Sequence, residues 1–152
     1  QAEGGIRELV RSRGLGDVYK RQALWGMHLV SVTQTGFMFR NSAERRAYFF
    51  LSDQYPGKGR KVVEVVFLGR PTLWLGGVEK YARRFRIPVY YFGIRRLERG
   101  RYEVFAEQIS SNPHQSEFGE ITRNYVRILE QEILNHPDNW LWSHRRWKNL
   151  AE

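Results

Sequence analysis

The stretch GEITRNYVRILEQEIL, residues 119–134, carries the clearest helix pattern in the chain. Its apolar residues recur at spacings of three and four, which predicts an amphipathic helix with one face against a core. That stripe and its edge consist of Ile121, Tyr125, Ile128, Leu129, Glu132 and Ile133. Pro137 follows, and proline ends one helix and suits the first position of another. We therefore predict a long helix and then a final helix that begins at Pro137.

Apolar runs on the N-terminal side of this helix predict the strands of its sheet. AYFFLSD (47–53) is a continuous apolar run, typical of a strand that is buried on both faces. Further strands are predicted at 62–69, 88–96 and 102–109, with LERGR (97–101) as the turn between the last two. GGVEKYARRFRI (76–87) predicts a helix, and residues 26–41 a strand leading into a helix. Strands that alternate with helices predict an α/β fold, a three-layer sandwich.

The composition fits one globular domain with anionic partners. The chain has 152 residues, 41% of them hydrophobic, and a formal net charge of +9. Without cysteine it has no disulfide, thiolate metal site or cysteine nucleophile. No apolar run approaches the roughly 20 residues of a membrane-spanning helix.

The first 22 residues differ in character from the rest. Their end, GLGDVYKRQ, resembles a peptide that recurs at the ends of proteins translated from environmental sequence assemblies. We expect residues 1–22 to be such an artefact; a short native amphipathic helix with Ile6, Leu9 and Val10 on one face is the alternative. Residues 23–152 are then the C-terminal part of a single domain.

Two basic regions are candidates for an anionic surface. The first joins the helix around residue 80 to the turn near residue 100, and its cations are Lys80, Arg83, Arg84, Arg86, Arg95, Arg96, Arg99 and Arg101. The second lies in WLWSHRRWKN (140–149), where Arg145, Arg146 and Lys148 adjoin three tryptophans. An ordinary solvated surface is the alternative for any one of these cations. For the tryptophans we favour burial in the core, and for the neighbouring cations a surface that faces anionic lipid.

The histidines supply no recognisable catalytic centre. A histidine base oriented by an acid five residues later would suit acyl transfer. None of the four histidines has an acid at that position. The residues five positions after His28, His114, His136 and His144 are Thr33, Gly119, Leu141 and Asn149. No metal site or cofactor is expected. Asp53, at the end of a predicted strand, either handles a ligand or caps its loop, and the sequence leaves these alternatives open.

Several stretches together resemble the bacterial lipid A biosynthesis acyltransferases, the late or secondary enzymes, in the form of their Bacteroidetes relatives. These stretches are LSDQYPG, GVEKYARR, PVYYFGIRRLERGRYEV, GEITRNYVRILEQEI and HPDNWLWSHRRWK, and the likeness runs from about Gly26 to Lys148. The resemblance implies the glycerol-phosphate acyltransferase fold. It also implies transfer of a fatty acyl group from acyl carrier protein to a hydroxyl of a lipid A precursor, at the cytoplasmic face of the inner membrane.

The resemblance further assigns site residues. Asp53 matches the family's functional aspartate, with a possible supporting role in catalysis, and Gly77, Glu79 and Arg95 match substrate-binding positions. The family's His-x-x-x-x-Asp/Glu motif is missing, and QALWGM (22–27) lacks the arginine that usually precedes GM. We therefore expect a fragment that is inactive alone. The alternatives are a relative that acts on another lipid and a basic nucleic-acid-binding module, although we expect no nucleic-acid partner.

Overall fold

The computed structural model describes residues 26–31, 34–40, 46–57, 60–144 and 146–147. The chain divides into two units, residues 1–45 and 46–152. In the first unit, α2 (Thr35–Arg40) is a short helix whose Phe39 is buried. Residues 26–31 form no strand ahead of it, contrary to our prediction, and our interpretation of residues 1–22 lies outside the described residues.

The second unit contains two hairpins and two helices. In chain order these are β1 (Val62–Phe67), β2 (Arg70–Leu75), α3 (Gly77–Phe85), β3 (Val89–Glu98), β4 (Arg101–Ser110) and α4 (Glu120–Asn135). Short 3₁₀ turns lie at Pro113–Gln115 and Pro137–Asn139. The helices predicted at 76–87 and 119–134 are confirmed, as are the strands predicted at 62–69, 88–96 and 102–109.

The hairpin β1–β2 contains a strand that sequence reasoning missed. Leu68 and Gly69 both have positive φ, 50° and 74°, as a two-residue hairpin turn requires, and Phe67 pairs with Arg70 across it. Pro71 makes RPTLWL a poor strand by composition. In a two-stranded sheet, however, every strand is an edge strand, and an edge strand tolerates proline.

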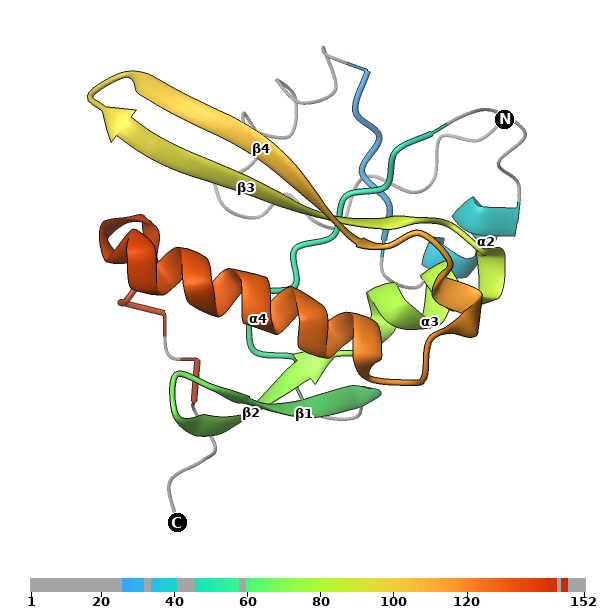
Figure 1. Ribbon diagram of the computed structural model, residues 1–152. Coiled ribbons are helices and arrows are strands. Elements are labelled where there is room, and N and C mark those ends of the chain that lie inside the picture. The colour runs from blue at the N-terminus through green and yellow to red at the C-terminus, as the bar shows by residue number, and fades with distance from the viewer. Residues whose placement is uncertain (1–25, 32–33, 41–45, 58–59, 145, 148–152) are drawn as a thin grey trace. The chain divides into compact units, whose positions relative to one another are not determined.

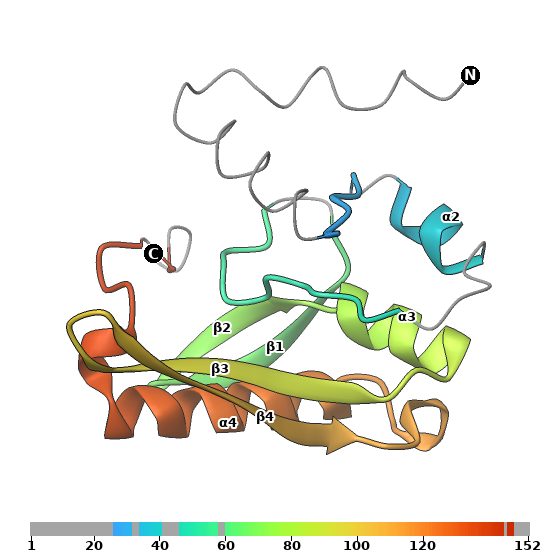
Figure 2. The ribbon, with the colours of Figure 1, turned by 90° about the horizontal axis from the view of Figure 1, so that it is seen from above.

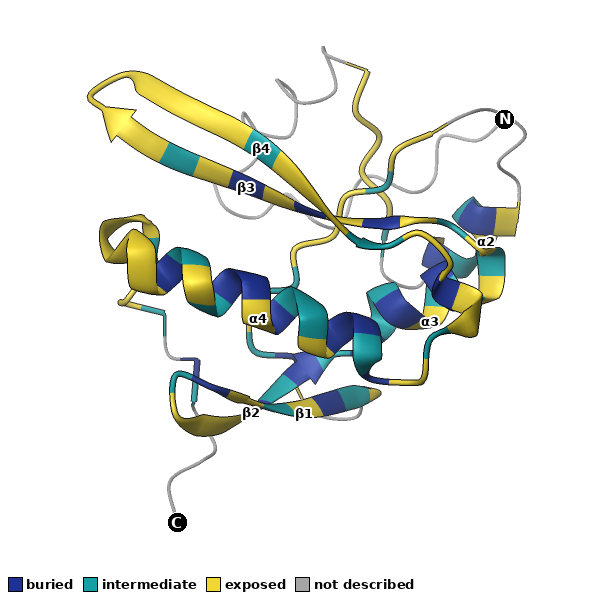
Figure 3. Ribbon diagram, in the orientation of Figure 1, coloured by how far each residue is buried: buried dark blue, intermediate teal, exposed yellow. Residues whose placement is uncertain are grey.

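The hairpin β3–β4 buries one face and exposes the other. Along β3, Val89, Tyr91 and Gly93 are buried while the residues between them are exposed, the alternation of a half-buried strand. Gly93 is required here because a Cβ would lie 2.3 Å from the Phe105 ring. Toward its tip the hairpin is exposed on both strands (Figure 3).

Helix α4 lies between the two hairpins (Figures 1 and 2) and contacts both. Its buried residues are Ile121, Thr122, Val126, Ile128, Leu129 and Ile133, in good agreement with the predicted stripe. The last four of these meet Phe67 and Trp74 from β1–β2 and Tyr91 from β3 in the main core, whereas Ile121 packs with Ala82 and Val89 in a second cluster. Glu130 Oε1 accepts a hydrogen bond from the Leu68 amide at 2.5 Å.

Three predictions need correction or stay open. Residues 47–53 form no strand, since no described strand pairs with them, and Phe49 and Leu51 are 66% and 82% exposed. The final helix is only the turn Pro137–Asn139, after which the Trp142 indole N–H donates to the Pro137 carbonyl at 2.7 Å. The chain mixes helices and strands, as predicted, but both described sheets are two-stranded and antiparallel. The three-layer sandwich stays a prediction.

Candidate functional site

Asp53 lies in an irregular segment beside the main core of the second unit. Its side chain is half-buried, and no hydrogen bond or salt bridge joins it to another described residue. The segment places its charge close enough to act on three buried or partly buried groups, Tyr91, Tyr125 and Arg146. The loop-capping alternative for Asp53 has no hydrogen bond to support it within the described residues.

Arg146, in the C-terminal segment, is buried, although we had predicted an exposed cation. The residue is 2% exposed, its guanidinium lies 4.2 Å from the Trp74 ring centroid, and Nη2 donates to the Leu73 carbonyl at 2.6 Å. Nε and Nη1 are buried and reach no acceptor in the described structure. Burial lowers the pKa of Arg146, while the negative charge of Asp53 opposes that shift. The anionic-surface prediction is therefore wrong for Arg146.

Two tyrosines complete this cluster of aromatic and charged groups. The Tyr125 ring centroid lies 5.8 Å from that of Trp74 and 5.8 Å from that of Tyr91. Burial raises the pKa of Tyr91 to about 12, and the negative charges of Glu132 and Asp53 act in the same direction. The pKa of Tyr125 is also raised, first by burial and then by Asp53. Both phenols therefore stay protonated at neutral pH.

Glu79, predicted to bind substrate, is fully buried at the N-terminus of α4. Its carboxylate accepts hydrogen bonds from the Gly119 amide, from the Thr122 amide at 3.2 Å and from the Thr122 hydroxyl at 2.6 Å. A carboxylate at this position satisfies helix amides that lack an intrahelical partner and interacts well with the helix dipole. Glu79 thus ties α3 to α4. Gly77 begins α3 and is half-buried.

Arg95 is likewise engaged within the chain. Its Nε and Nη2 bind both carboxylate oxygens of Glu132 at 2.8 and 2.7 Å, and Nη1 lies 3.2 Å from Glu103. The guanidinium also covers the Phe105 ring at 4.1 Å. The Glu132 bond is the largest cause of a raised pKa for Arg95, and the Arg95 bond in turn lowers the pKa of Glu132. The observed contacts of Arg95 join β3 to α4, and substrate binding by Arg95 and Glu79 stays a prediction.

The remaining predicted cations differ in exposure. Lys80, Arg84 and Arg86 are exposed on or just after α3, whereas Arg83 is half-buried with an Nε that has no acceptor in the described structure. At the other end of the region, Arg96, Arg99 and Arg101 are exposed around the tip of β3–β4. Arg145 and Lys148 lie outside the described residues. The exposed cations of α3 and the hairpin are accessible to a partner, and an anionic surface there stays a prediction.

The tryptophans of the C-terminal segment are divided between core and surface. Trp140 and Trp147 pack against the main core, which confirms their predicted burial, and the Trp147 indole N–H donates to Thr72 Oγ1 at 2.8 Å. Trp142 is 59% exposed, so the predicted burial is wrong for this tryptophan, and the neighbouring Leu141 is 67% exposed. Sequence reasoning missed the burial of Arg146. The adjacent tryptophans were the only signal that could have indicated it.

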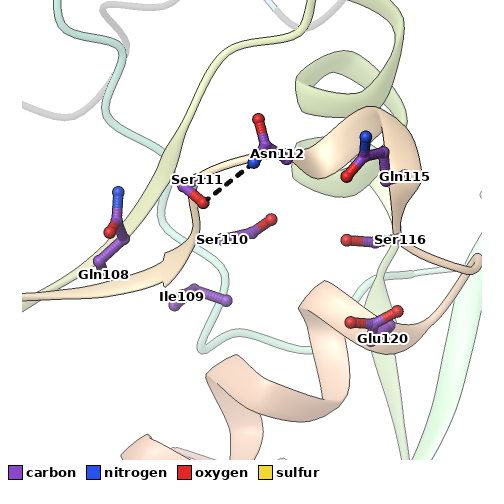
Figure 4. Close-up of a pocket in the computed structure, with 8 residues that line it drawn as sticks. All are labelled: Gln108, Ile109, Ser110, Ser111, Asn112, Gln115, Ser116 and Glu120. Atoms are coloured by element: carbon purple, nitrogen blue, oxygen red, sulfur yellow. Dashed lines mark hydrogen bonds between the residues drawn. The ribbon is translucent and has the colours of Figure 1, made fainter.

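No other described region offers a comparable site. A polar depression at the C-terminal end of β4 is lined by the side chains drawn in Figure 4, from Gln108 to Glu120. Among them, Asn112 Nδ2 donates to Ser111 Oγ at 3.4 Å. The described residues contain no group of three histidine or acidic side chains that could hold a metal ion. None of the described helices is long and apolar enough to cross a membrane.

Comparison with known proteins places the chain among enzymes. Its described part is a mixed chain of helices and antiparallel hairpins, with a half-buried carboxylate near a buried arginine and a basic surface. The family model for the bacterial lipid A biosynthesis acyltransferases matches residues 37–149, and the chain therefore belongs to that family. Searches of curated proteins and of solved structures gave no match.

Proposed function

We propose that this chain is the C-terminal, supporting part of an enzyme that moves a fatty acyl group from acyl carrier protein to a hydroxyl of a lipid A precursor. The observation that carries the proposal is the family match over residues 37–149, which includes both the segment around Asp53 and the C-terminal tryptophan–arginine segment. The complete domain would have the three-layer fold of the glycerol-phosphate acyltransferases.

Within this proposal the matched residues have different roles. Asp53 supports the reaction directly, because the fold does not use its carboxylate in any hydrogen bond among the described residues. Glu79 and Arg95 act indirectly, since they fix the beginning and the second half of α4 against α3 and β3. Gly77 is the first residue of α3, and its proposed role is substrate binding.

The reaction also needs a base that this sequence lacks. A hydroxyl nucleophile requires a group that accepts its proton, and none of the four histidines has an acid at the required spacing. The purified 152-residue chain should therefore give no product when it is mixed with an acyl carrier protein thioester and a lipid A precursor. Product formed at an enzymatic rate by this chain alone would contradict the proposal.

The acceptor can be tested in the same assay with a longer protein that includes a His-x-x-x-x-Asp/Glu motif. We expect acylation of the lipid A precursor and little or none of a lysophospholipid. The opposite preference would establish the alternative, a relative that acts on another lipid.

The proposed location is the cytoplasmic face of the inner membrane. At the tip of β3–β4, the exposed apolar side chains of Leu97 and Tyr102 lie among the exposed cations Arg96, Arg99 and Arg101. Apolar and cationic groups together suit an anionic lipid surface, where each cation adds about 1 kcal/mol of attraction. We expect binding to vesicles that contain anionic phospholipid, weakened by salt and by Arg99→Gln, and no binding to neutral vesicles.

The matched control for this experiment is Arg123→Gln, which removes one exposed cation from α4 instead of from the hairpin. Equal losses from both variants would assign the binding to net charge alone. Tight, steeply salt-dependent binding to DNA would instead favour the nucleic-acid-binding module.

A further inference from the structure

Only one edge of the Arg146 guanidinium makes a hydrogen bond within the fold. One edge is occupied, since Nη2 donates to the Leu73 carbonyl and the flat face covers the Trp74 ring. The other edge, formed by Nε and Nη1, is buried and reaches no acceptor among the described residues. Buried donors without an acceptor are uncommon in native proteins, and a buried charge needs compensation. This free edge therefore requires an acceptor, ideally an anionic one.

Asp53 is the acidic group whose charge acts most strongly on Arg146. Its carboxylate is half-buried and makes no hydrogen bond or salt bridge to any described residue, so both of its oxygens can accept hydrogen bonds. The other acids near this core are already engaged, because Glu130 binds the Leu68 amide and Glu132 binds Arg95. Asp53 and the free edge of Arg146 thus form the one unsatisfied pair of opposite charges in the described core.

We propose that Arg146 is a positioning residue for Asp53, and that the free Nε and Nη1 edge of its buried guanidinium holds the Asp53 carboxylate in place. The two groups form no hydrogen bond or salt bridge in this structure, so the proposed contact requires another Asp53 rotamer or a bridging water molecule. The inference rests on the proposed function, in which Asp53 belongs to the site. It gives the C-terminal segment a role beyond covering the core.

A purely structural role for Arg146 predicts different behaviour. In that case the Leu73 carbonyl and the Trp74 ring account for all that the residue does, and Asp53 has no effect on it. The Arg146 Nε–H group can distinguish the two roles, because it belongs to the free edge and gives its own NMR signal. Arg146→Lys, which removes that signal, identifies it in the spectrum of the 152-residue chain.

The test is Asp53→Asn in the 152-residue chain. We expect the Arg146 Nε–H signal to shift and its proton to exchange with water at least about tenfold faster, because a charge-assisted hydrogen bond is lost. Asp138→Asn is the matched control, since it removes the same charge from an exposed position in the C-terminal segment and should leave the signal unchanged. Glu132→Gln is the positive control and should shift the Nε–H signal of Arg95.

A second readout compares thermal midpoints. Arg146→Gln should lower the midpoint by less in the Asp53→Asn background than in the parent chain, because the charge coupling is already absent. Two results together would overturn the proposal. Arg146→Gln would lower the midpoint equally in both backgrounds, and Asp53→Asn would leave the Arg146 signal unchanged while the Arg95 control signal shifted. Neither readout depends on turnover, so this result would leave the proposed acyltransferase function standing, and a failed acyl-transfer assay would leave the coupling standing.

Discussion

The regions around Glu79 and Asp53 place two carboxylates that the family resemblance selects in contrasting environments. Glu79 is fully buried and accepts three hydrogen bonds from the first turn of α4 and the residue before it. Asp53 is half-buried, lies in irregular chain and has no hydrogen-bond partner among the described residues. The difference indicates that a completely satisfied charge holds the fold, whereas an incompletely satisfied charge is available to a site.

The largest effect on stability should come from Glu79, the carboxylate whose hydrogen bonds are all made within the fold. Glu79→Ala leaves the Gly119 amide and both Thr122 donors buried without an acceptor. We expect a loss of about 3–5 kcal/mol in the free energy of unfolding, measured by urea denaturation. Glu120→Gln is the control, because Glu120 accepts only an exposed bond from the Glu117 amide. Similar losses of stability for Glu79→Ala and Glu120→Gln would contradict the structural role of Glu79.

Alkaline pH tests the aromatic groups between the two regions. Because the pKa of Tyr91 is raised from 10.0 to about 12, its contribution to stability is complete below pH 10 and is lost as the pH rises through about 12. The expected loss is about 3 kcal/mol. Urea denaturation at each pH measures it, and absorbance monitors tyrosine ionisation. Tyr91→Phe should reduce the alkaline loss to the part that comes from Tyr125, whereas Tyr90→Phe, on the exposed face of the same strand, should leave the loss unchanged.

Acidic pH tests the ion pair at the other end of α4. Arg95 lowers the pKa of Glu132, so the stability that this pair provides is present above the ordinary glutamate pKa and is lost as the pH falls through the lowered value. The parent chain should therefore lose thermal stability in that acidic range. Arg95→Gln should lower the midpoint at neutral pH and flatten this acidic dependence. The same acidic slope in parent and variant would show that Glu132 has no special role.

The smallest effect on stability should come from Asp53. Asp53→Asn should change the free energy of unfolding by about 1 kcal/mol, because asparagine keeps an acceptor oxygen for Arg146 and only the negative charge is lost. Urea denaturation of Asp53→Asn and Glu79→Ala under the same conditions compares their losses of stability directly. A loss as large as that of Glu79→Ala would mean that Asp53 is also a structural residue.

Much of the fold followed from periodicity. Spacings of three and four located α3 and α4, and apolar runs located β1, β3 and β4. Strand β2 was missed because Pro71 argues against a strand, although an edge strand accepts it. Residues 47–53 were misassigned because a run of apolar residues reports a preference for burial, and a strand also requires a partner strand.

The site was predicted only in its residue identities. The resemblance selected Asp53, Glu79 and Arg95, but periodicity cannot say which charges find partners, because the partners are 37 to 43 residues away in the chain. Arg146 shows the same limit, since its burial depends on Leu73 and Trp74 in a strand that the sequence did not reveal. Local sequence thus predicts elements well and the environment of a buried charge poorly.

The most direct test uses a longer protein that includes the His-x-x-x-x-Asp/Glu motif and measures acyl transfer and the thermal midpoint on the same preparations. Asp53→Asn should lower turnover by about 100-fold or more while the midpoint stays close to that of the parent. Glu79→Gln should lower the midpoint strongly, and any loss of turnover should follow the loss of folded protein. Undiminished acyl transfer by Asp53→Asn would contradict the account.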